Sequence, residues 1–131
     1  LKVKGSISGR MESAIRQALQ DASPKVQLVE LESTGGMMHP SFRIARLLEA
    51  HKVDTVVKGK CASGCLILFL GGKRRIVAHG ARLGVHPPQF ASGRVADDQL
   101  NAPARASLVS SAEKLRAFYR AQGVRERFIS K

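Results

Sequence analysis

The sequence has no tryptophan and one tyrosine, and aromatic residues make up 5% of its 131 positions. Proteins that bind single-stranded nucleic acid need aromatic side chains on which bases stack, so this scarcity argues against that class. Acidic residues are also few, since 10 Asp and Glu stand against 22 Lys and Arg and leave a net charge of +12. The basic residues are scattered, so we interpret them as a solvated surface and expect no nucleic acid partner, while an acidic partner stays open.

Long apolar runs and a large set of cysteines are missing as well. The longest apolar stretch, residues 65–70, suits a buried segment and is far below the roughly 20 residues of a membrane-spanning helix. Two cysteines are too few for a disulfide scaffold or a four-ligand zinc site, and we predict neither a metal nor a cofactor. The chain starts at Leu1 without a signal peptide, so we expect that targeting information has been removed, and membrane association stays open.

Strand and helix patterns alternate along the chain. Apolar residues recur at helical spacing in several segments, and short β-branched runs that end near Gly, Ser or Pro lie between them. This alternation predicts an α/β fold with a mostly parallel sheet, as one domain over residues 1–131. The predicted strands are residues 2–7, 26–31, 53–57, 75–78 and 82–85, the predicted helices are 11–22, 38–48, 64–70 and 108–119, and 89–103 is a predicted loop.

Three turns that follow predicted strands carry residues suited to acyl transfer. In open parallel sheets ligands bind at the carboxyl ends of the strands, where such turns lie. Ser63 supplies a hydroxyl nucleophile, and His86 is a base that can take its proton near neutral pH. The backbone N–H groups of Gly64 and Gly35 can hold an oxyanion. The three turns are Ser33-Thr34-Gly35-Gly36, Cys61-Ala62-Ser63-Gly64 and Val85-His86-Pro87.

Together and in this order, the motifs resemble those of the Clp protease proteolytic subunit and its relatives in the Clp/crotonase superfamily. The resemblance runs from about Val3 to Arg120. Ser33-Thr34-Gly35-Gly36 is similar to the family's Ser-Pro-Gly-Gly loop, Ala62-Ser63-Gly64 to its Ala-Ser-Met-Gly turn, and Ala81-Arg82-Leu83-Gly84-Val85-His86-Pro87 to its Ser-Arg-Val-Met-Ile-His-Gln-Pro stretch. Cys61-x-Ser63-x-Cys65 followed by Gly-Ala-Arg-Leu-Gly-Val-His resembles a group of bacterial, predicted periplasmic Clp-like proteins.

The resemblance implies a fold, a reaction and an assembly. The fold would be a spiral of repeated ββα units, and the activity that of a serine peptidase on peptide or protein substrates. Its catalytic residues would be Ser63 and His86, its oxyanion hole would come from Gly35 and Gly64, and the chain would form a closed homo-oligomer in the periplasm. A cytoplasmic location is the alternative.

The third member of the catalytic triad is not evident. The family places an aspartate well after the histidine, whereas Asp97 and Asp98 come too early here and Glu126 lies near the right place. The resemblance therefore implies a domain that continues past the C-terminus and carries the acid there; the alternatives are that another group orients His86 or that the site is incomplete. Lys114 is the lysine that could form a Ser-Lys dyad, as in the related signal peptide peptidases. Whether the chain is an enzyme is therefore uncertain. A binding or scaffold protein without turnover is the first alternative, and crotonase-type chemistry on an acyl-coenzyme A thioester is the second.

The two cysteines flank Ser63. They are either two small buried side chains or a local disulfide, and no further ligand lies nearby to complete a metal site. A bond between Cys61 and Cys65 would hold the turn that carries Ser63. Such a bond would also tie the protein to an oxidising compartment. We predict this disulfide, with free buried thiols as the alternative.

Overall fold

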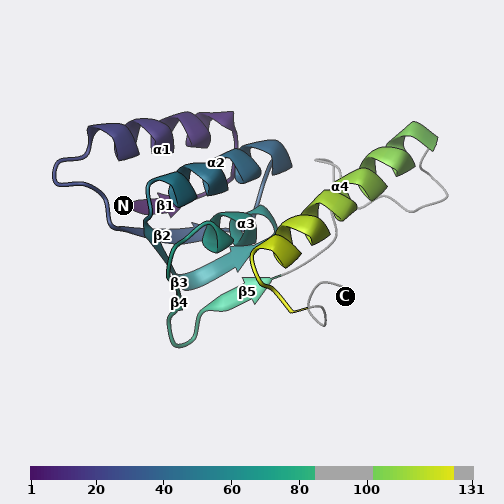
Figure 1. The fold of residues 1–131 in the computed structure, drawn as a ribbon. Coiled ribbons are helices and arrows are strands. Elements are labelled where there is room, and N and C mark those ends of the chain that lie inside the picture. Colours follow the sequence, from purple (N-terminus) through teal and green to yellow (C-terminus); the bar gives the residue numbers. More distant parts are fainter. Residues whose placement is uncertain (85–101, 126–131) are drawn as a thin grey trace. The chain divides into compact units, whose positions relative to one another are not determined.

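The computed structural model describes residues 1–84 and 102–125, and Figure 1 shows how their helices and strands are arranged. Residues Leu1–Val85 form one compact unit and His86–Lys131 a second. The described elements, in chain order, are β1 (Lys2–Lys4), α1 (Gly9–Asp21), β2 (Leu28–Ser33), α2 (Met38–Ala50), β3 (Asp54–Ala62), α3 (Gly64–Leu70), β4 (Arg75–Val77), β5 (Arg82–Gly84) and α4 (Ala102–Ala121).

The first unit is a parallel sheet with helices on one face. The strands lie in the order β1-β2-β3-β4, and β5 pairs with the far end of β3. Each of these pairings is parallel. Helices α1, α2 and α3 each connect one strand to its parallel neighbour, and such crossovers are right-handed, so the three helices cover the same face (Figure 1). The prediction of an α/β fold with a mostly parallel sheet is confirmed.

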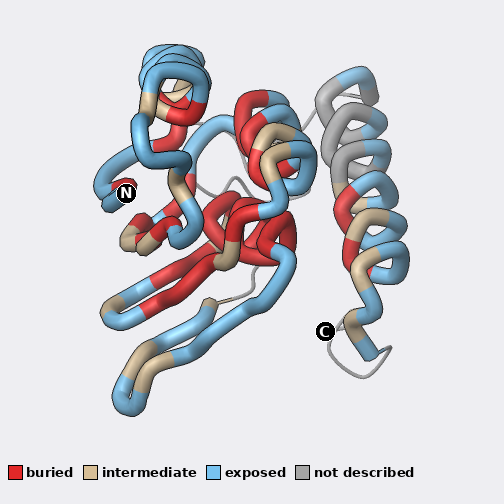
Figure 2. The backbone as a smooth tube through the Cα atoms, turned by 60° about the vertical axis from the view of Figure 1, so that its left-hand side comes forward, coloured by how far each residue is buried: buried red, intermediate tan, exposed pale blue. Residues whose placement is uncertain are grey.

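The core lies between the sheet and these helices. Ile15 and Leu19, four positions apart on α1, are buried, which is the stripe expected of an amphipathic helix. Helix α3 differs, because all seven of its residues are buried, and Figure 2 shows this buried segment between the sheet and α2. A helix that is apolar all round must be enclosed by its neighbours, so α3 is the centre of the unit.

The opposite face of the sheet is charged. Lys2 and Lys58 both pair with Glu30 across neighbouring strands, at 3.5 Å and 3.1 Å, and Lys4 pairs with Glu32 at 3.3 Å. The three lysine side chains are largely exposed, so these ion pairs are screened by solvent and contribute little to stability. Parallel sheets are usually covered on both faces. The charged side chains make this face polar, so it can remain in contact with solvent.

Several boundaries differ from the predictions by one or two residues, and three differ by more. Strand β3 does not end at residue 57 but runs to Ala62, because its last residues pair with β5. Strand β1 ends at Lys4, and only Ile7 beyond it pairs again, as an isolated bridge to Gly36. Helix α4 starts at residue 102 and not 108, since its first turn lacks the apolar spacing that marks the rest. Local composition concealed all three boundaries.

The second unit is described through α4 and residues 122–125. Leu115 and Tyr119 are buried and lie four positions apart, as the predicted helical stripe requires. Burial also raises the pKa of Tyr119 to about 12. No helix within the described ranges is long and apolar enough to cross a membrane. The expectation of one domain stays a prediction.

Candidate functional site

Ser63 lies in the turn between β3 and α3, in a backbone conformation that is rare for a residue with a side chain. Its φ is 55° and its ψ is −122°, and among the described residues only Lys52 is another non-glycine with positive φ. These angles match the first central position of a type II′ turn, where glycine is usual. Holding serine there costs on the order of 1–3 kcal/mol, so the surrounding structure must impose it. Strain of this kind is found at nucleophiles on sharp strand-to-helix turns.

Two backbone hydrogen bonds hold this turn. The Ser63 N–H donates to the Gly84 carbonyl at 3.0 Å, and the Leu66 N–H donates to the Ser63 carbonyl at 3.0 Å. The Ser63 hydroxyl makes no hydrogen bond with any described residue, although the residue begins a helix. The side chain is half-buried. A fixed backbone and an unused, partly accessible hydroxyl suit a nucleophile.

Gly35 brings the loop after β2 against Ser63. Its φ is +112°, and a Cβ built on it would lie 2.8 Å from the Ser63 Cβ and 3.2 Å from the Ser63 Oγ. Any side chain at this position would therefore displace the serine. The Gly35 N–H, however, donates to the Ser33 Oγ at 3.0 Å. The oxyanion role predicted for Gly35 stays a prediction, and in this structure its N–H is already used.

Gly36 presents the other N–H of the glycine pair. The Ile7 N–H donates to the Gly35 carbonyl at 3.0 Å, and the Met37 N–H donates to the Ile7 carbonyl at 2.9 Å. In a parallel bridge of this pattern, the groups of the middle residue point away from the partner strand. The bridge to Ile7 therefore leaves the Gly36 N–H unused. Gly36 is exposed, and its N–H has no acceptor among the described residues.

Gly64 begins α3 directly after Ser63. The first N–H groups of a helix have no acceptor within it, so the Gly64 N–H is left unused by the helix. A Cβ on Gly64 would lie 2.5 Å from the Ser41 Oγ and 3.3 Å from the Ile7 Cδ1. The Ser41 hydroxyl donates to the Met37 carbonyl at 2.7 Å, which fixes it in that place. The close contact with Ser41 explains why this position has no side chain.

A disulfide joins Cys61 in β3 to Cys65 in α3. Their Cα atoms are 5.2 Å apart, and both residues are 0% exposed. Cys61 is in register with Ser33 on β2 and with Leu83 on β5. The bond therefore spans the Ser63 turn. It joins the sheet at the level where the neighbouring strands β2 and β5 end.

His86 lies outside the described residues, so its predicted role as the base stays a prediction. The chain that leads to it is described: Gly84, two positions before His86, is in register with Ala62, one position before Ser63. Asp97, Asp98 and Glu126 also lie outside the described residues. Lys114 is exposed on α4, in the second unit.

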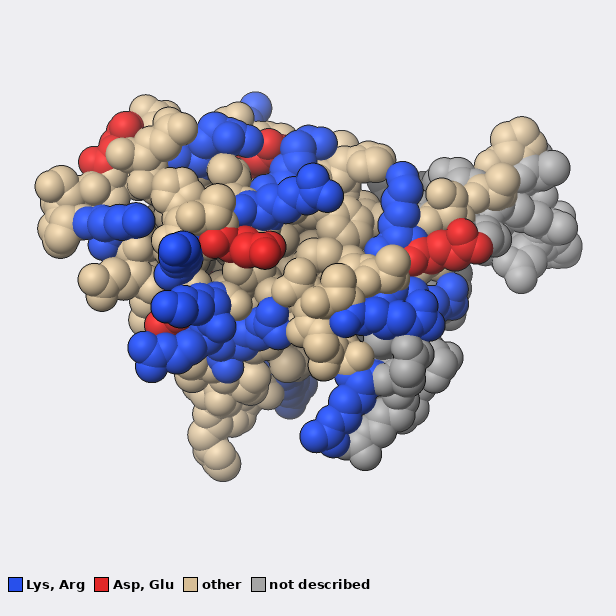
Figure 3. Space-filling model, in the orientation of Figure 1, with Lys and Arg blue, Asp and Glu red and all other residues tan. Residues whose placement is uncertain are grey.

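Charge is not gathered in a single patch on the face that Figure 3 shows. Figure 3 shows Lys and Arg side chains in several separate groups on the visible face, with Asp and Glu between some of them. Arg43 and Arg16 lower the pKa of Glu12, and Lys58 and Lys2 lower that of Glu30. Neither carboxylate is a predicted site residue. Within the described ranges, no three His, Cys, Asp or Glu side chains gather in a way that could hold a metal ion.

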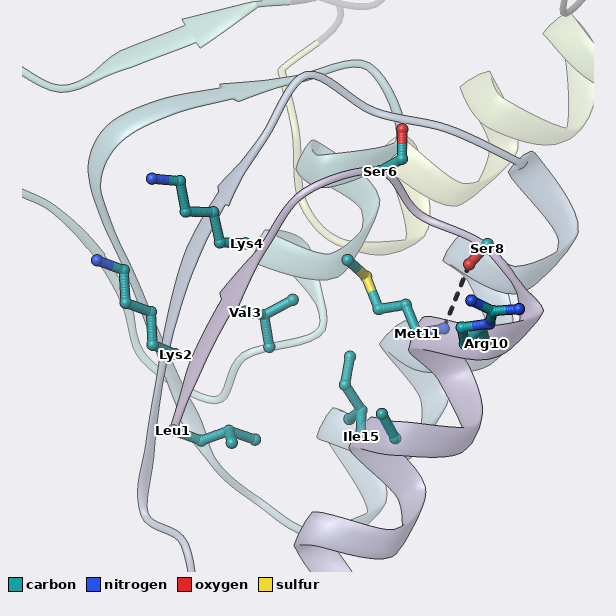
Figure 4. Close-up of a pocket in the computed structure, with 10 residues that line it drawn as sticks. Leu1, Lys2, Val3, Lys4, Ser6, Ser8, Arg10, Met11 and Ile15 are labelled. Carbon is teal, nitrogen blue, oxygen red and sulfur yellow. Dashed lines mark hydrogen bonds between the residues drawn. The ribbon is translucent and has the colours of Figure 1, made fainter.

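A cavity of about 350 Å³ lies elsewhere, between β1 and α1. Figure 4 shows Val3, Met11 and Ile15 pointing into the space, while Lys2 and Lys4 point away from it. None of the predicted site residues lines this cavity. We therefore place the candidate site at the Ser63 turn.

Sequence reasoning named the Gly35-Gly36 pair but chose Gly35 as the donor, because the choice between two adjacent glycines depends on the bridge to Ile7. It missed Gly84, whose carbonyl accepts from the Ser63 N–H, because the pairing of β5 with β3 joins distant segments. The alternation of N–H directions along the extended residues after β2 is the signal that could have favoured Gly36.

The comparisons with known proteins agree with this architecture. No family model and no curated protein matches the sequence. Among solved structures, a point mutant of ClpP1 from Listeria monocytogenes has a TM-score of 0.78 and 17% identity, over 99% of this chain and 75% of that one. ClpP1 from the same organism gives 0.75 and 18% over the same shares. The chain therefore has the Clp protease fold.

Proposed function

We propose that this chain is a Clp-type serine peptidase with Ser63 as its nucleophile. One observation carries the proposal: a serine held at φ 55° on a strand-to-helix turn, with a hydroxyl that no described residue uses. Such strain has to be compensated by the rest of the fold, which is expected where function requires it. The fold shared with ClpP1 adds support.

In the proposed reaction, His86 takes the proton of the Ser63 hydroxyl as its oxygen attacks the carbonyl carbon of a peptide bond. The carbonyl oxygen becomes an oxyanion and accepts hydrogen bonds from backbone N–H groups. We assign these donors to Gly64 and Gly36, in place of Gly35, because the Gly35 N–H is bonded to Ser33. His86 then gives its proton to the leaving amine, and water hydrolyses the acyl-enzyme by the reverse steps.

The setting of this reaction is part of the proposal. A buried disulfide persists in an oxidising compartment, which supports a periplasmic location. Assembly into a closed homo-oligomer, a peptide or protein substrate and the spiral of ββα units are carried over from the resemblance to the Clp family. Light scattering on the purified chain tests the assembly, and a monomer at all concentrations would contradict it.

A fluorophosphonate probe tests the nucleophile. We expect it to label the protein on Ser63, and Ser63→Ala and His86→Ala to abolish the labelling. His79→Ala is the matched control, because His79 is an exposed histidine in the turn between β4 and β5. Labelling that persists in His86→Ala would remove His86 from the role of base. A wild-type protein that does not react would favour the binding or scaffold alternative.

A further inference from the structure

We propose that the Cys61–Cys65 disulfide is a positioning element for Ser63, and that its reduction switches the site off while the unit stays folded. The proposal rests on the proposed function, since it concerns the same serine. It goes further by assigning the site a dependence on the redox state of two residues that do not touch the substrate.

The disulfide joins residues on both sides of the turn that carries Ser63. Cys61 is flanked in the sheet by Ser33, which comes just before the loop with Gly35, and by Leu83, which comes just before Gly84, the acceptor of the Ser63 N–H. Cys65 is the second residue of α3. The disulfide therefore ties the first turn of the helix to the sheet, on both sides of the residue with the unusual backbone.

Apart from the disulfide and the packing against Gly35, only backbone hydrogen bonds hold Ser63 in place. Its own backbone makes the two hydrogen bonds to Gly84 and from Leu66, and its side chain does not cap the helix. Without the disulfide, the backbone can rotate toward an ordinary conformation and release the strain at φ 55°. A hydroxyl that moves by about 1 Å loses on the order of a hundredfold in rate.

The fold does not depend on the bond to the same degree. The cysteines are four positions apart, and so short a closed loop restricts the unfolded chain little. Apolar side chains enclose the core on other elements, among them Val29, Ile44 and Leu48, which are 0% exposed. The two thiols formed by reduction are themselves small and tolerate an apolar site. We expect the reactivity of Ser63 to fall much further than stability.

Reduction is a two-electron step. A dithiol such as dithiothreitol attacks one sulfur, the S–S bond breaks, and the reagent closes to its cyclic disulfide. The protein gains two electrons and two protons as two S–H groups. Because both cysteines are 0% exposed, the attack requires local opening of the turn, so small dithiols are suitable reagents.

The labelling rate of Ser63 provides the first measurement. The oxidised chain and the dithiothreitol-reduced chain are compared for the rate of fluorophosphonate labelling, with thermal unfolding followed in parallel. We expect about hundredfold slower labelling after reduction, recovery on reoxidation, and a cooperative thermal transition in both states. The double variant Cys61→Ala/Cys65→Ala should label slowly with or without the reductant. Equal labelling of oxidised and reduced protein would overturn the positioning role and leave Ser63 as the nucleophile.

Hydrogen exchange provides a second measurement that needs no reactivity. The Ser63 and Leu66 amides should exchange at least about tenfold faster in the reduced protein, because their hydrogen bonds hold the turn. The Asp54 amide, which donates to the Gln27 carbonyl at 2.9 Å near the start of β3, should not change. Unchanged exchange at Ser63 and Leu66 would overturn the proposal even if the probe labelled neither form, an outcome that would separately contradict the proposed function.

Discussion

Two helices of this chain begin with the same dipeptide. Ser8-Gly9 begins α1 and Ser63-Gly64 begins α3, and in each case the serine is the N-cap. Ser8 has extended angles, φ −151° and ψ 174°, and its Oγ accepts a hydrogen bond from the Met11 N–H at 3.3 Å. Ser63 has positive φ and its Oγ caps nothing.

The glycines differ in the same way. A Cβ on Gly9 would meet no atom within 4 Å, whereas a Cβ on Gly64 would lie against Ser41. The first pair stabilises the start of α1 through the Ser8 cap. In the second pair Gly64 is buried, and Ser63 has a strained backbone and does not cap the helix. The comparison teaches that an identical local sequence can cap one helix with its serine hydroxyl and leave that hydroxyl unused at another, because tertiary packing sets the backbone conformation of the serine.

The largest contrast is expected between the two serine-to-alanine variants. Ser63→Ala should reduce peptide hydrolysis and probe labelling below detection, because loss of a nucleophile typically costs about a millionfold in kcat. Ser8→Ala should leave both unchanged and lower the free energy of unfolding by about 1 kcal/mol, since it removes an N-cap hydrogen bond. Labelling assays with chemical denaturation measure both. Equal losses of activity in the two variants would show that Ser63 acts through stability alone.

The next largest difference is expected between the stabilities of the two glycine-to-alanine variants. Gly64→Ala should lower the free energy of unfolding by about 1–3 kcal/mol, because the added methyl group overlaps the Ser41 hydroxyl. Gly9→Ala should raise it by about 0.4–1 kcal/mol, since the space is open and the unfolded chain loses freedom. Urea denaturation curves measure the difference. A Gly64→Ala protein as stable as wild type would mean that Ser41 moves aside at no cost.

Replacing each serine by glycine should produce effects of opposite sign. Ser63→Gly should raise the free energy of unfolding by about 1 kcal/mol while abolishing labelling, because glycine adopts φ 55° without strain. Ser8→Gly should lower stability by only about a few tenths of a kcal/mol. Thermal unfolding of the three proteins measures this, and a less stable Ser63→Gly variant would contradict the inferred strain.

The smallest effect concerns charge in the first helical turn, which Glu12 supplies in α1 and no acidic residue supplies in α3. Hydrogen bonding to Arg43 lowers the pKa of Glu12 in the folded state, so its stabilising contribution is present near neutral pH and is lost as pH falls through that lowered pKa. Wild type should therefore lose slightly more stability than Glu12→Gln, by less than about 1 kcal/mol, between about pH 6 and pH 3.

Acid titration of unfolding measures this difference. Glu49→Gln is the control, because Glu49 makes no ion pair among the described residues. Identical acid sensitivity of wild type and Glu12→Gln would show that the pairs with Arg43 and Arg16 contribute nothing.

The sequence was sufficient for the order of the strands and helices and for the grouping of Ser63 with the Gly35 loop, because periodicity and glycine placement are local signals. It was insufficient for the φ of Ser63, because the residues that contact this turn, Gly84 and the disulfide pair, come to it only through strand pairing and side-chain bonding. It was also insufficient to choose between Gly35 and Gly36, because a bridge to Ile7 sets their directions. Lys58 and Lys60 concealed the length of β3, since they are exposed and polar.

The far end of α3 is packed as closely as the end that carries Ser63. A Cβ on Gly71 would lie 2.6 Å from the Ala45 carbonyl oxygen, and the Thr55 side chain fills the space beside Gly72. In evolutionary terms, positions 71 and 72 accept as few residue types as position 64 beside the serine. A helix about 10 Å long separates them from Ser63. A methyl group gained at position 71 would overlap the backbone of α2, and one gained at position 72 would overlap the Thr55 side chain of β3. Because both contacts belong to the packing of the fold and neither involves Ser63, we expect relatives to keep the two glycines whether or not they keep the serine.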